Sequence, residues 1–310
     1  MQLDVSIAFF IMGAIAVVLK SKIDFPKALY QSLTLFLMVA IGLKGGVALS
    51  AHASWDLIPQ SLSVIAFGLF LPLLAFPVLF FIGRLDRKDA ASIAAHYGSV
   101  SVGTYAVAVA FLESQDIAYE AYFPLFVVLL EMPAIVMGIM LARTKGAALD
   151  RRVLIHELFC NQGMVLMLGG LIIGFWAGAR TESIAPFFFD LFHGVLALFL
   201  FEMGMVAATR LSQIKESGSF IFSFGIAMPL IGGLLGSWLG LAIGLSTGGA
   251  ILLAVLGGSA SYIAVPAAMR VVLPDANHGL SITASLGITF PFNVLIGIPT
   301  YVLFTQWLVN

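Results

Sequence analysis

Long apolar stretches separated by short polar connections dominate this chain. The stretches are continuously hydrophobic and do not alternate between polar and apolar residues, so the pattern favours helices over the strands of a barrel. A helix needs about 20 apolar residues to cross a bilayer. We therefore predict an all-α membrane protein with ten transmembrane segments, at residues 3–20, 28–50, 57–82, 90–112, 121–142, 160–179, 185–208, 219–244, 249–270 and 279–309.

The composition also indicates a membrane protein. Of the 310 residues, 61% are hydrophobic and only 10% are charged, whereas roughly a quarter are charged in soluble domains. The net charge of −1 gives no basic surface for a nucleic acid. A single cysteine, Cys160, excludes an internal disulfide. Because phosphate-binding loops and nucleophile–base motifs are also missing from the sequence, we expect no enzymatic activity and no bound cofactor.

The distribution of basic residues predicts the orientation in the membrane. All 15 Lys and Arg residues except Lys44 and Arg180 lie in the odd-numbered connections. Basic residues favour the cytoplasmic side, so these connections are predicted to face the cytoplasm and both termini to lie outside.

The chain is predicted to contain an inverted repeat. A polar linker at 144–159 separates residues 1–143 from residues 160–310, and each part holds five segments. Because five is odd, the two parts must have opposite orientations. The Gly-Ser-Val-Ser run at 98–101 in the fourth segment matches Gly-Ser-Ala-Ser at 258–261 in the ninth. We predict two inverted five-helix repeats joined by a cytoplasmic linker.

Segments four and nine are predicted to be broken helices. Unwound backbone inside a membrane is tolerated only where it is buried in protein or lines an aqueous cavity. Pro266 suits the first turn of a new helix. We predict breaks near 98–104 and 258–264, with the two second half-helices meeting at their N-terminal ends. Such ends suit a small anion, and unwound carbonyls suit a monovalent cation. Alternatively, the small residues only allow close helix packing.

Ionisable residues inside spans are further candidates. Glu131 is predicted to bind a cation or carry a proton, or else to be a structural hydrogen-bonding acid. Together with the hydroxyls of Ser101, Ser259, Ser261 and Tyr262, it forms the candidate cation site, for which Na+ is the possible ion. Lys44 either pairs with Glu202 or extends to the outer surface. Packing or interface roles are expected for Asp190, His193 and His96.

Several short motifs occur in order along nearly the whole chain. They are Ile-Gly-Leu-Lys-Gly-Gly at 41–46, Gly-Ser-Val-Ser at 98–101, Leu-Glu at 112–113, Tyr-Glu-Ala at 119–121, Glu131 followed by Pro133 and Ala134, and a closing run at 274–299. Together these motifs resemble the sodium-dependent bicarbonate transporter family of cyanobacteria and other bacteria.

The resemblance implies gate-like and core-like domains, a homotrimer, sodium-coupled uptake of bicarbonate between the broken helices, and a PII-like cytoplasmic regulator. Carried over to this sequence, the anion site comprises Ser99, Ser101, Gly103, Thr104, Ser259, Ser261 and Ala264. Tyr262 stands where the family pattern has Asp, so coupling to sodium or to protons stays open. We expect a secondary transporter of a small anion in a bacterial inner membrane, with an anion channel or a proton-coupled carboxylate carrier as alternatives.

Overall fold

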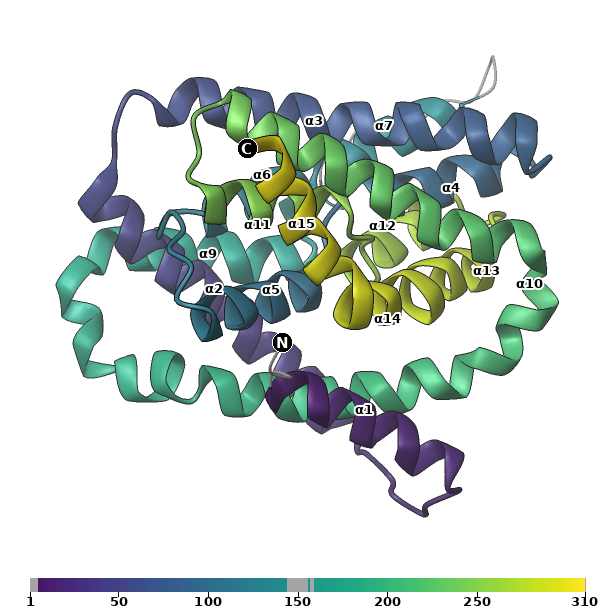
Figure 1. The fold of residues 1–310 in the computed structure, drawn as a ribbon, viewed down its shortest axis with the longest axis horizontal. Coiled ribbons are helices and arrows are strands. Elements are labelled where there is room, and N and C mark those ends of the chain that lie inside the picture. Colours follow the sequence, from purple (N-terminus) through teal and green to yellow (C-terminus); the bar gives the residue numbers. More distant parts are fainter. Residues whose placement is uncertain (1–4, 144–155, 157–158, 310) are drawn as a thin grey trace.

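The computed structural model describes residues 5–143, 156 and 159–309, and every regular element in this part of the chain is a helix (Figure 1). Most of the predicted linker, 144–155 and 157–158, lies outside the described residues. Within the described part, eight helical stretches are long and apolar enough to cross a membrane. They are Lys27–His52, Leu57–Ile82, Arg87–Ser114, Pro124–Ala142, Gln162–Ser183, Phe192–Arg210, Gly218–Ala242 and His278–Val309.

Two of the ten predicted segments, the first and the ninth, are not among these eight stretches. The first is α1 (Val5–Val18), which ends before a turn in which Lys20 has a φ of 54°. The ninth holds α11 (Thr247–Gly257) and α12 (Ala264–Val272). At 1.5 Å per residue, neither α1 nor α11 reaches the roughly 30 Å of a hydrocarbon core.

The remaining helices of the first part match the predicted segments closely. They are α2 (Lys27–His52), α3 (Leu57–Pro77) with a π-helical end η1 (Val78–Ile82), α4 (Arg87–Gly98), α5 (Val102–Ser114), α6 (Pro124–Glu131) and α7 (Pro133–Ala142). Pro124 and Pro133 each occupy a first helical turn, where a missing N–H removes no helical hydrogen bond.

The second part is less regular. It comprises α9 (Gln162–Ala177), η2 (Gly178–Ser183), η3 (Pro186–Asp190), α10 (Phe192–Ala242), α11, α12, α13 (His278–Ile282), η4 (Thr283–Thr289), α14 (Phe290–Phe292), η5 (Asn293–Gly297) and α15 (Ile298–Val309). Gly218, at φ 83°, interrupts the helical backbone of α10, which therefore holds two candidate spans. In Figure 1, α10 bends back around the other helices.

Both predicted helix breaks are confirmed. Helix α4 ends at Gly98 and α5 begins at Val102, while α11 ends at Gly257 and α12 begins at Ala264. Gly98 fits its place because a Cβ there would collide with the ring of Pro72 in α3. Ser101 caps α5 by accepting a hydrogen bond from the Thr104 N–H at 3.1 Å.

Two helix pairs outside the breaks pack at very short range. Helix α1 runs along α10, and α2 runs along α9. In the second pair Gly42 and Gly46 face the α9 backbone, while Gly170 and Gly174 face the α2 backbone, and a Cβ at any of the four would collide with it. Small residues permit this close approach of membrane helices.

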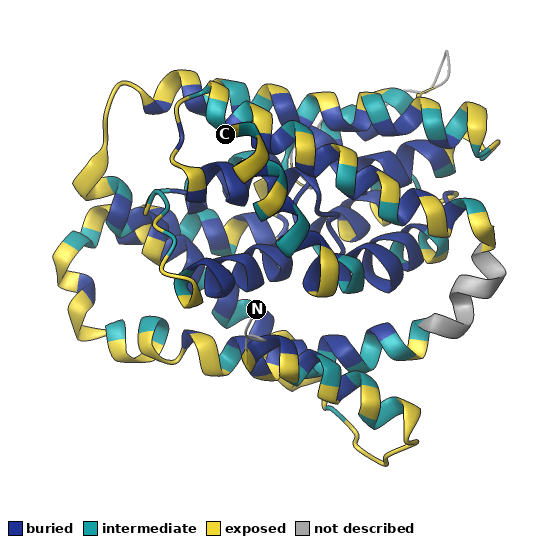
Figure 2. Cartoon of the chain, in the orientation of Figure 1, coloured by how far each residue is buried: buried dark blue, intermediate teal, exposed yellow. Residues whose placement is uncertain are grey.

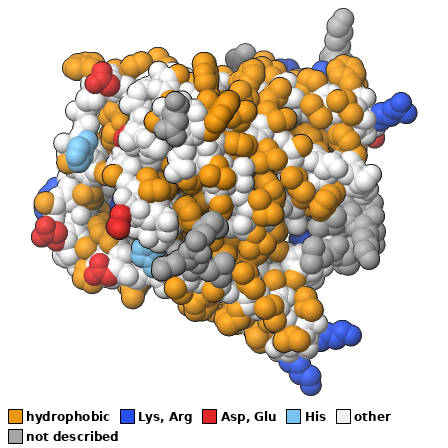
Figure 3. Space-filling model, viewed as in Figure 1, with side chains coloured by type: hydrophobic (Ala, Val, Ile, Leu, Met, Phe, Trp, Pro, Cys, Tyr) orange, Lys and Arg blue, Asp and Glu red, His pale blue; other side chains and the backbone are white. Residues whose placement is uncertain are grey.

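The broken helices lie in the centre of the protein. Every residue from 102 to 112 of α5 is buried, as is every residue from 248 to 257 of α11 (Figure 2). The outside is apolar. Trp238 is 61% exposed and Trp307 72%, and hydrophobic side chains cover much of the face in Figure 3, with most charged side chains toward its left and right edges. This surface suits a lipid environment.

Candidate functional site

Hydrogen bonds tie the two breaks to one another. The Ser261 N–H donates to the His96 carbonyl oxygen at 2.8 Å, and His96 Nδ1 donates back to the Ser261 carbonyl oxygen at 2.6 Å. The Ser101 N–H donates to Ser259 Oγ at 3.1 Å. The backbone groups freed by one break thus find partners in the other, as buried polar groups must.

The second half-helices begin beside serine hydroxyls. Ser101 Oγ accepts from the Thr104 N–H at 3.1 Å and from Thr104 Oγ1 at 2.8 Å, at the start of α5. Ser261 Oγ accepts from the Val265 N–H at 3.4 Å, at the start of α12. The N-terminal end of a helix carries partial positive charge, so two such ends with hydroxyls beside them favour an anion.

A small pocket lies between these two helix ends. We call it the crossing pocket; it is lined by Met38, Val100, Ser101, Val102, Glu131, Ser261, Tyr262, Ile263 and Ala264. Five predicted site residues meet there: Ser101, Glu131, Ser261, Tyr262 and Ala264. The space is too narrow for a water molecule. The structure therefore shows the crossing pocket closed.

The other predicted site residues adjoin this pocket without lining it. Ser99 Oγ is 3.5 Å from the Glu131 carbonyl oxygen. Ser259 Oγ donates to the Leu256 carbonyl oxygen at 2.9 Å. Gly103 faces the Tyr262 hydroxyl so closely that a Cβ there would collide with it. Thr104 bonds to Ser101, so its hydroxyl helps to orient a lining residue.

Three buried polar atoms at the crossing find no hydrogen-bond partner among the described residues. They are His96 Nε2, Glu131 Oε2 and the Tyr262 hydroxyl. Ser101 is a polar neighbour of Tyr262, but the two do not form a well-oriented bond. Burying such a group without a partner costs about 1–3 kcal/mol. Of these residues, Glu131 and Tyr262 line the crossing pocket, so their atoms are available to a ligand there.

Glu131 also faces the start of α9. A Cβ at Gly163 would lie 3.1 Å from Glu131 Oε1 and 3.4 Å from Oδ1 of Asn161. Asn161 caps α9 by accepting from the Met164 N–H at 2.9 Å. The carboxyl group therefore connects the crossing to the α2–α9 pair.

A polar pair behind the ninth segment was not predicted from the sequence. Asn293 Nδ2 donates to the Gly258 carbonyl oxygen at 2.8 Å, and the Tyr301 hydroxyl donates to Asn293 Oδ1 at 2.6 Å. Asn293 is fully buried. The available signal was an amide side chain inside a long apolar segment, a position that demands an internal partner.

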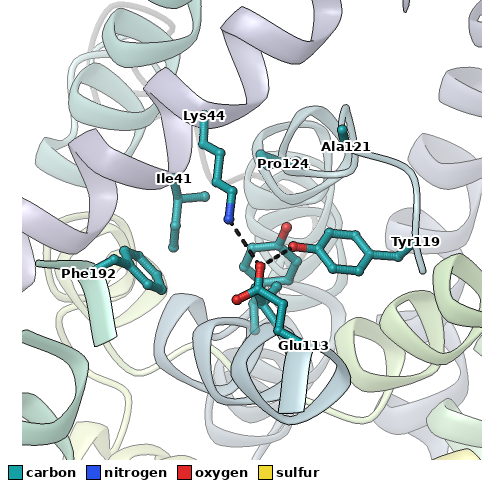
Figure 4. A pocket seen from close by; sticks show the side chains of 9 residues that line it. Ile41, Lys44, Glu113, Tyr119, Ala121, Pro124 and Phe192 are labelled. Carbon is teal, nitrogen blue, oxygen red and sulfur yellow. Dashed lines mark hydrogen bonds and ion pairs between the residues drawn. The ribbon is translucent and has the colours of Figure 1, made fainter. Parts of the chain in front are cut away.

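Of the two alternatives predicted for Lys44, the pairing with Glu202 is wrong. Lys44 Nζ lies 3.1 Å from Glu113 Oε1, and its side chain is 52% exposed (Figure 4). The Tyr119 hydroxyl donates to the same oxygen at 2.8 Å, and His193 Nε2 lies 3.2 Å from Glu113 Oε2. His193 thus has the expected interface role. Glu202 instead lines a separate pocket with Asp24 and Arg210.

Comparison with known proteins agrees with the sequence resemblance. Residues 6–306, nearly the whole chain, match the Na+-dependent bicarbonate transporter superfamily. This is a family of transporters and not of enzymes. A search of curated proteins finds no match to the chain.

Proposed function

We propose that this chain, which belongs to the Na+-dependent bicarbonate transporter superfamily, is a secondary active transporter that takes up bicarbonate or a similar small anion together with sodium. One observation carries the proposal. Two half-helices from different parts of the chain bring their N-terminal ends and two serine hydroxyls to the same closed pocket. The arrangement provides dipoles and hydroxyl donors for an anion in a place that water does not reach.

Ser101 and Ser261 are the proposed anion ligands. Ser101 Oγ accepts two hydrogen bonds from Thr104, so its own O–H remains available as a donor. Ser261 Oγ accepts one long bond from Val265 N–H. The N–H groups of the first turns of α5 and α12, including those of Gly103 and Ala264, complete the proposed site.

Glu131 is proposed as the coupling residue. Its side chain reaches the crossing pocket and one carboxylate oxygen has no partner there. Sodium would take this oxygen together with hydroxyls of Ser101, Ser259, Ser261 and Tyr262. The unpartnered oxygen equally supports a second candidate, proton coupling, because a carboxyl group in a span can carry a proton.

Transport requires the closed pocket to open alternately to each side. We propose ten membrane helices in two inverted repeats, which the packing supports: α1 packs on α10 as α2 packs on α9. These four elements would form the gate and the broken helices the core. Met38 of α2 lines the closed pocket together with residues of the breaks. We expect opening to move α2 relative to the broken helices.

The coupling experiment uses proteoliposomes with a sodium gradient alone or a proton gradient alone. We expect uptake of labelled bicarbonate under the sodium gradient and its loss in Glu131→Gln. Glu182→Gln, which changes an exposed glutamate, is the matched control. Indifference of the wild-type protein to sodium would remove sodium as the coupling ion. Sodium-dependent uptake that survives Glu131→Gln would remove Glu131 from the mechanism.

Counterflow separates a carrier from an anion channel. Unlabelled bicarbonate inside the vesicles should accelerate the entrance of labelled bicarbonate through a carrier, because the loaded site returns faster. A channel shows no such acceleration, so equal initial rates would favour the channel.

The proposed orientation places both termini outside a bacterial inner membrane and the region around Asp116 on the same side. It can be tested in a Cys160→Ala background with single cysteines at Asp116 and Lys145. An impermeant thiol reagent added outside should label the first position and not the second. We also propose a homotrimer and a PII-like cytoplasmic regulator, as the resemblance implies. The mass of the purified complex tests the trimer.

A further inference from the structure

A second pocket lies along the same helices as the crossing pocket. We call it the outer pocket; it is lined by Ile41, Lys44, Tyr105, Val109, Glu113, Tyr119, Ala121, Pro124 and Phe192. Along α2 the lining passes from Met38 at the crossing to Ile41 and Lys44, and along α5 from Val102 to Tyr105. Residues three or four apart share one helix face. The outer pocket therefore continues the crossing pocket toward one end of the protein.

The outer pocket has room for a small ion. Its volume is about 150 Å³, whereas a single water needs about 10–15 Å³ by the same measure. The walls are largely apolar, and the polar groups come from Lys44, Glu113 and two tyrosines (Figure 4). A few polar groups in an apolar cavity are typical of a small-ligand site.

The Glu113 carboxylate shows what these donors can bind. Its Oε1 accepts from Lys44 Nζ at 3.1 Å and from the Tyr119 hydroxyl at 2.8 Å, and its Oε2 faces His193 Nε2 at 3.2 Å. A carboxylate is a planar oxyanion with the same two-oxygen edge as bicarbonate. Since Lys44 lies on α2, His193 on α10 and Glu113 on α5, three helices meet at this one acid.

Tyr105 supplies a donor that Glu113 does not use. Its side chain is 2% exposed and lines the outer pocket. The hydroxyl makes no hydrogen bond to another described residue, although Glu113 and Tyr119 are near enough to influence it electrostatically. A buried tyrosine usually has a hydrogen-bond partner. An ion in the outer pocket would provide one.

We propose that the outer pocket is a second binding site for a small oxyanion, passed before the crossing pocket is reached. Lys44, Tyr105 and Tyr119 donate hydrogen bonds to the anion. The Glu113 carboxylate competes with the anion for these donors and separates from Lys44 when the anion binds. The inference rests on the proposed function in that the anion is the transported one. A charge-assisted hydrogen bond from a solvent-exposed lysine attracts the anion, and because solvent screens the lysine charge the anion is not bound too tightly to leave.

The opposite charges of Lys44 and Glu113 make the test decisive. An ion pair that only fastened α5 to α2 would be lost in Lys44→Gln and in Glu113→Gln alike, so both variants would change anion binding in the same direction. In a binding site with a competitor, removing the lysine weakens binding and removing the carboxylate strengthens it.

The experiment titrates purified protein with bicarbonate at constant ionic strength and follows thermal stability. In Lys44→Gln the half-saturating concentration should rise about tenfold. In Glu113→Gln it should fall by about two- to fivefold, since exposed ion pairs contribute modestly. The matched controls are Lys88→Gln and Asp275→Asn, which break another exposed ion pair, 2.6 Å long, and should leave the concentration unchanged.

Two measurements keep this inference separate from the proposed function. If the half-saturating concentration shifts in the same direction in both variants, or shifts in neither variant, the outer site is overturned even if vesicles take up bicarbonate. Opposite shifts in a protein that fails to transport bicarbonate would support the outer site and count against the proposed function. If Glu113→Gln does not fold, Tyr105→Phe replaces it: the site predicts weaker binding by about fivefold, and unchanged binding would contradict it.

Discussion

The crossing pocket and the outer pocket lie along the same helix faces, but they hold polar groups in different ways. At the crossing, Ser101 and Ser261 are each 2% exposed, and hydrogen bonds join them to the other break. At the outer pocket, Lys44 and Glu113 form an ion pair, and their side chains are 52% and 33% exposed. The crossing pocket is lined by hydroxyls and helix ends together with one buried acid, Glu131, whereas the ion pair of the outer pocket lies where solvent reaches it.

This difference reflects the free energy of removing charge from water. An ion buried in a medium of low polarity loses several kcal/mol of solvation, which only excellent partners restore. Hydroxyls and backbone N–H groups lose far less solvation free energy on burial. They can also hydrogen-bond to each other while no anion is bound. A site that must release its anion on either side of the membrane therefore benefits when the protein groups that bind the anion are neutral. Solvent-reachable charge is better suited to attracting the ion.

The largest expected effect comes from breaking the crossing itself. His96→Ala removes a fully buried side chain bonded to Ser261 and leaves a cavity and an unpaired carbonyl oxygen. The free energy of unfolding should fall by about 2–4 kcal/mol. His52→Ala is the control, because His52 is exposed and its ring bonds to the Ala48 carbonyl oxygen of the same helix. Comparable melting temperatures for the two variants would show that the crossing is not held by His96.

The next effect separates ligand-binding serines from packing serines. Ser101→Ala and Ser261→Ala should each weaken anion binding about ten- to a hundredfold, equivalent to about 1.5–3 kcal/mol for one hydrogen bond to a charged ligand. Ser237→Ala removes a buried serine that bonds to Thr305 and does not line the crossing pocket. Calorimetric titration should show normal affinity in Ser237→Ala. Normal anion affinity in all three variants would indicate that Ser101 and Ser261 serve close helix packing and do not bind the anion.

At the outer pocket the expected effect on stability is small. Glu113→Gln should lower the free energy of unfolding by about 1 kcal/mol or less, since solvent screens partly exposed ion pairs. Chemical unfolding in detergent measures this value. A loss as large as that of His96→Ala would mean that the outer charges also hold the helices together, and the contrast between the pockets would fail.

The smallest effect is expected at a fully exposed pair. The Lys88 ammonium donates a hydrogen bond to Asp275 and lowers the pKa of that carboxyl. Because the pKa is lower in the folded state, any stabilisation is present above the usual carboxyl pKa of about 4 and is lost as the pH falls through the folded value. Asp275→Asn should leave the melting temperature at pH 7 unchanged. A measurable fall would show that this exposed pair contributes as much as a buried one.

The sequence predicted the helix breaks because their signals are local. Gly98, Pro266 and the flanking serines restrict or free the backbone where they stand. The partners were not predictable in this way. His96 meets Ser261 across 165 positions and Lys44 meets Glu113 across 69, and such contacts depend on how whole helices pack. The inverted repeat and the orientation in the membrane stay predictions.

The α2–α9 contact also bears on how the chain is made. Gly42 and Gly170, whose backbones meet, are separated by roughly 130 residues. At a synthesis rate of about 5–20 residues per second, α2 waits about 6–26 s before its partner leaves the ribosome. During that time its glycine face meets lipid or a chaperone instead of α9. The short helix α1 waits longer still for α10. The first helices to be inserted are thus among the last to find their native neighbours, and biogenesis must protect them until then.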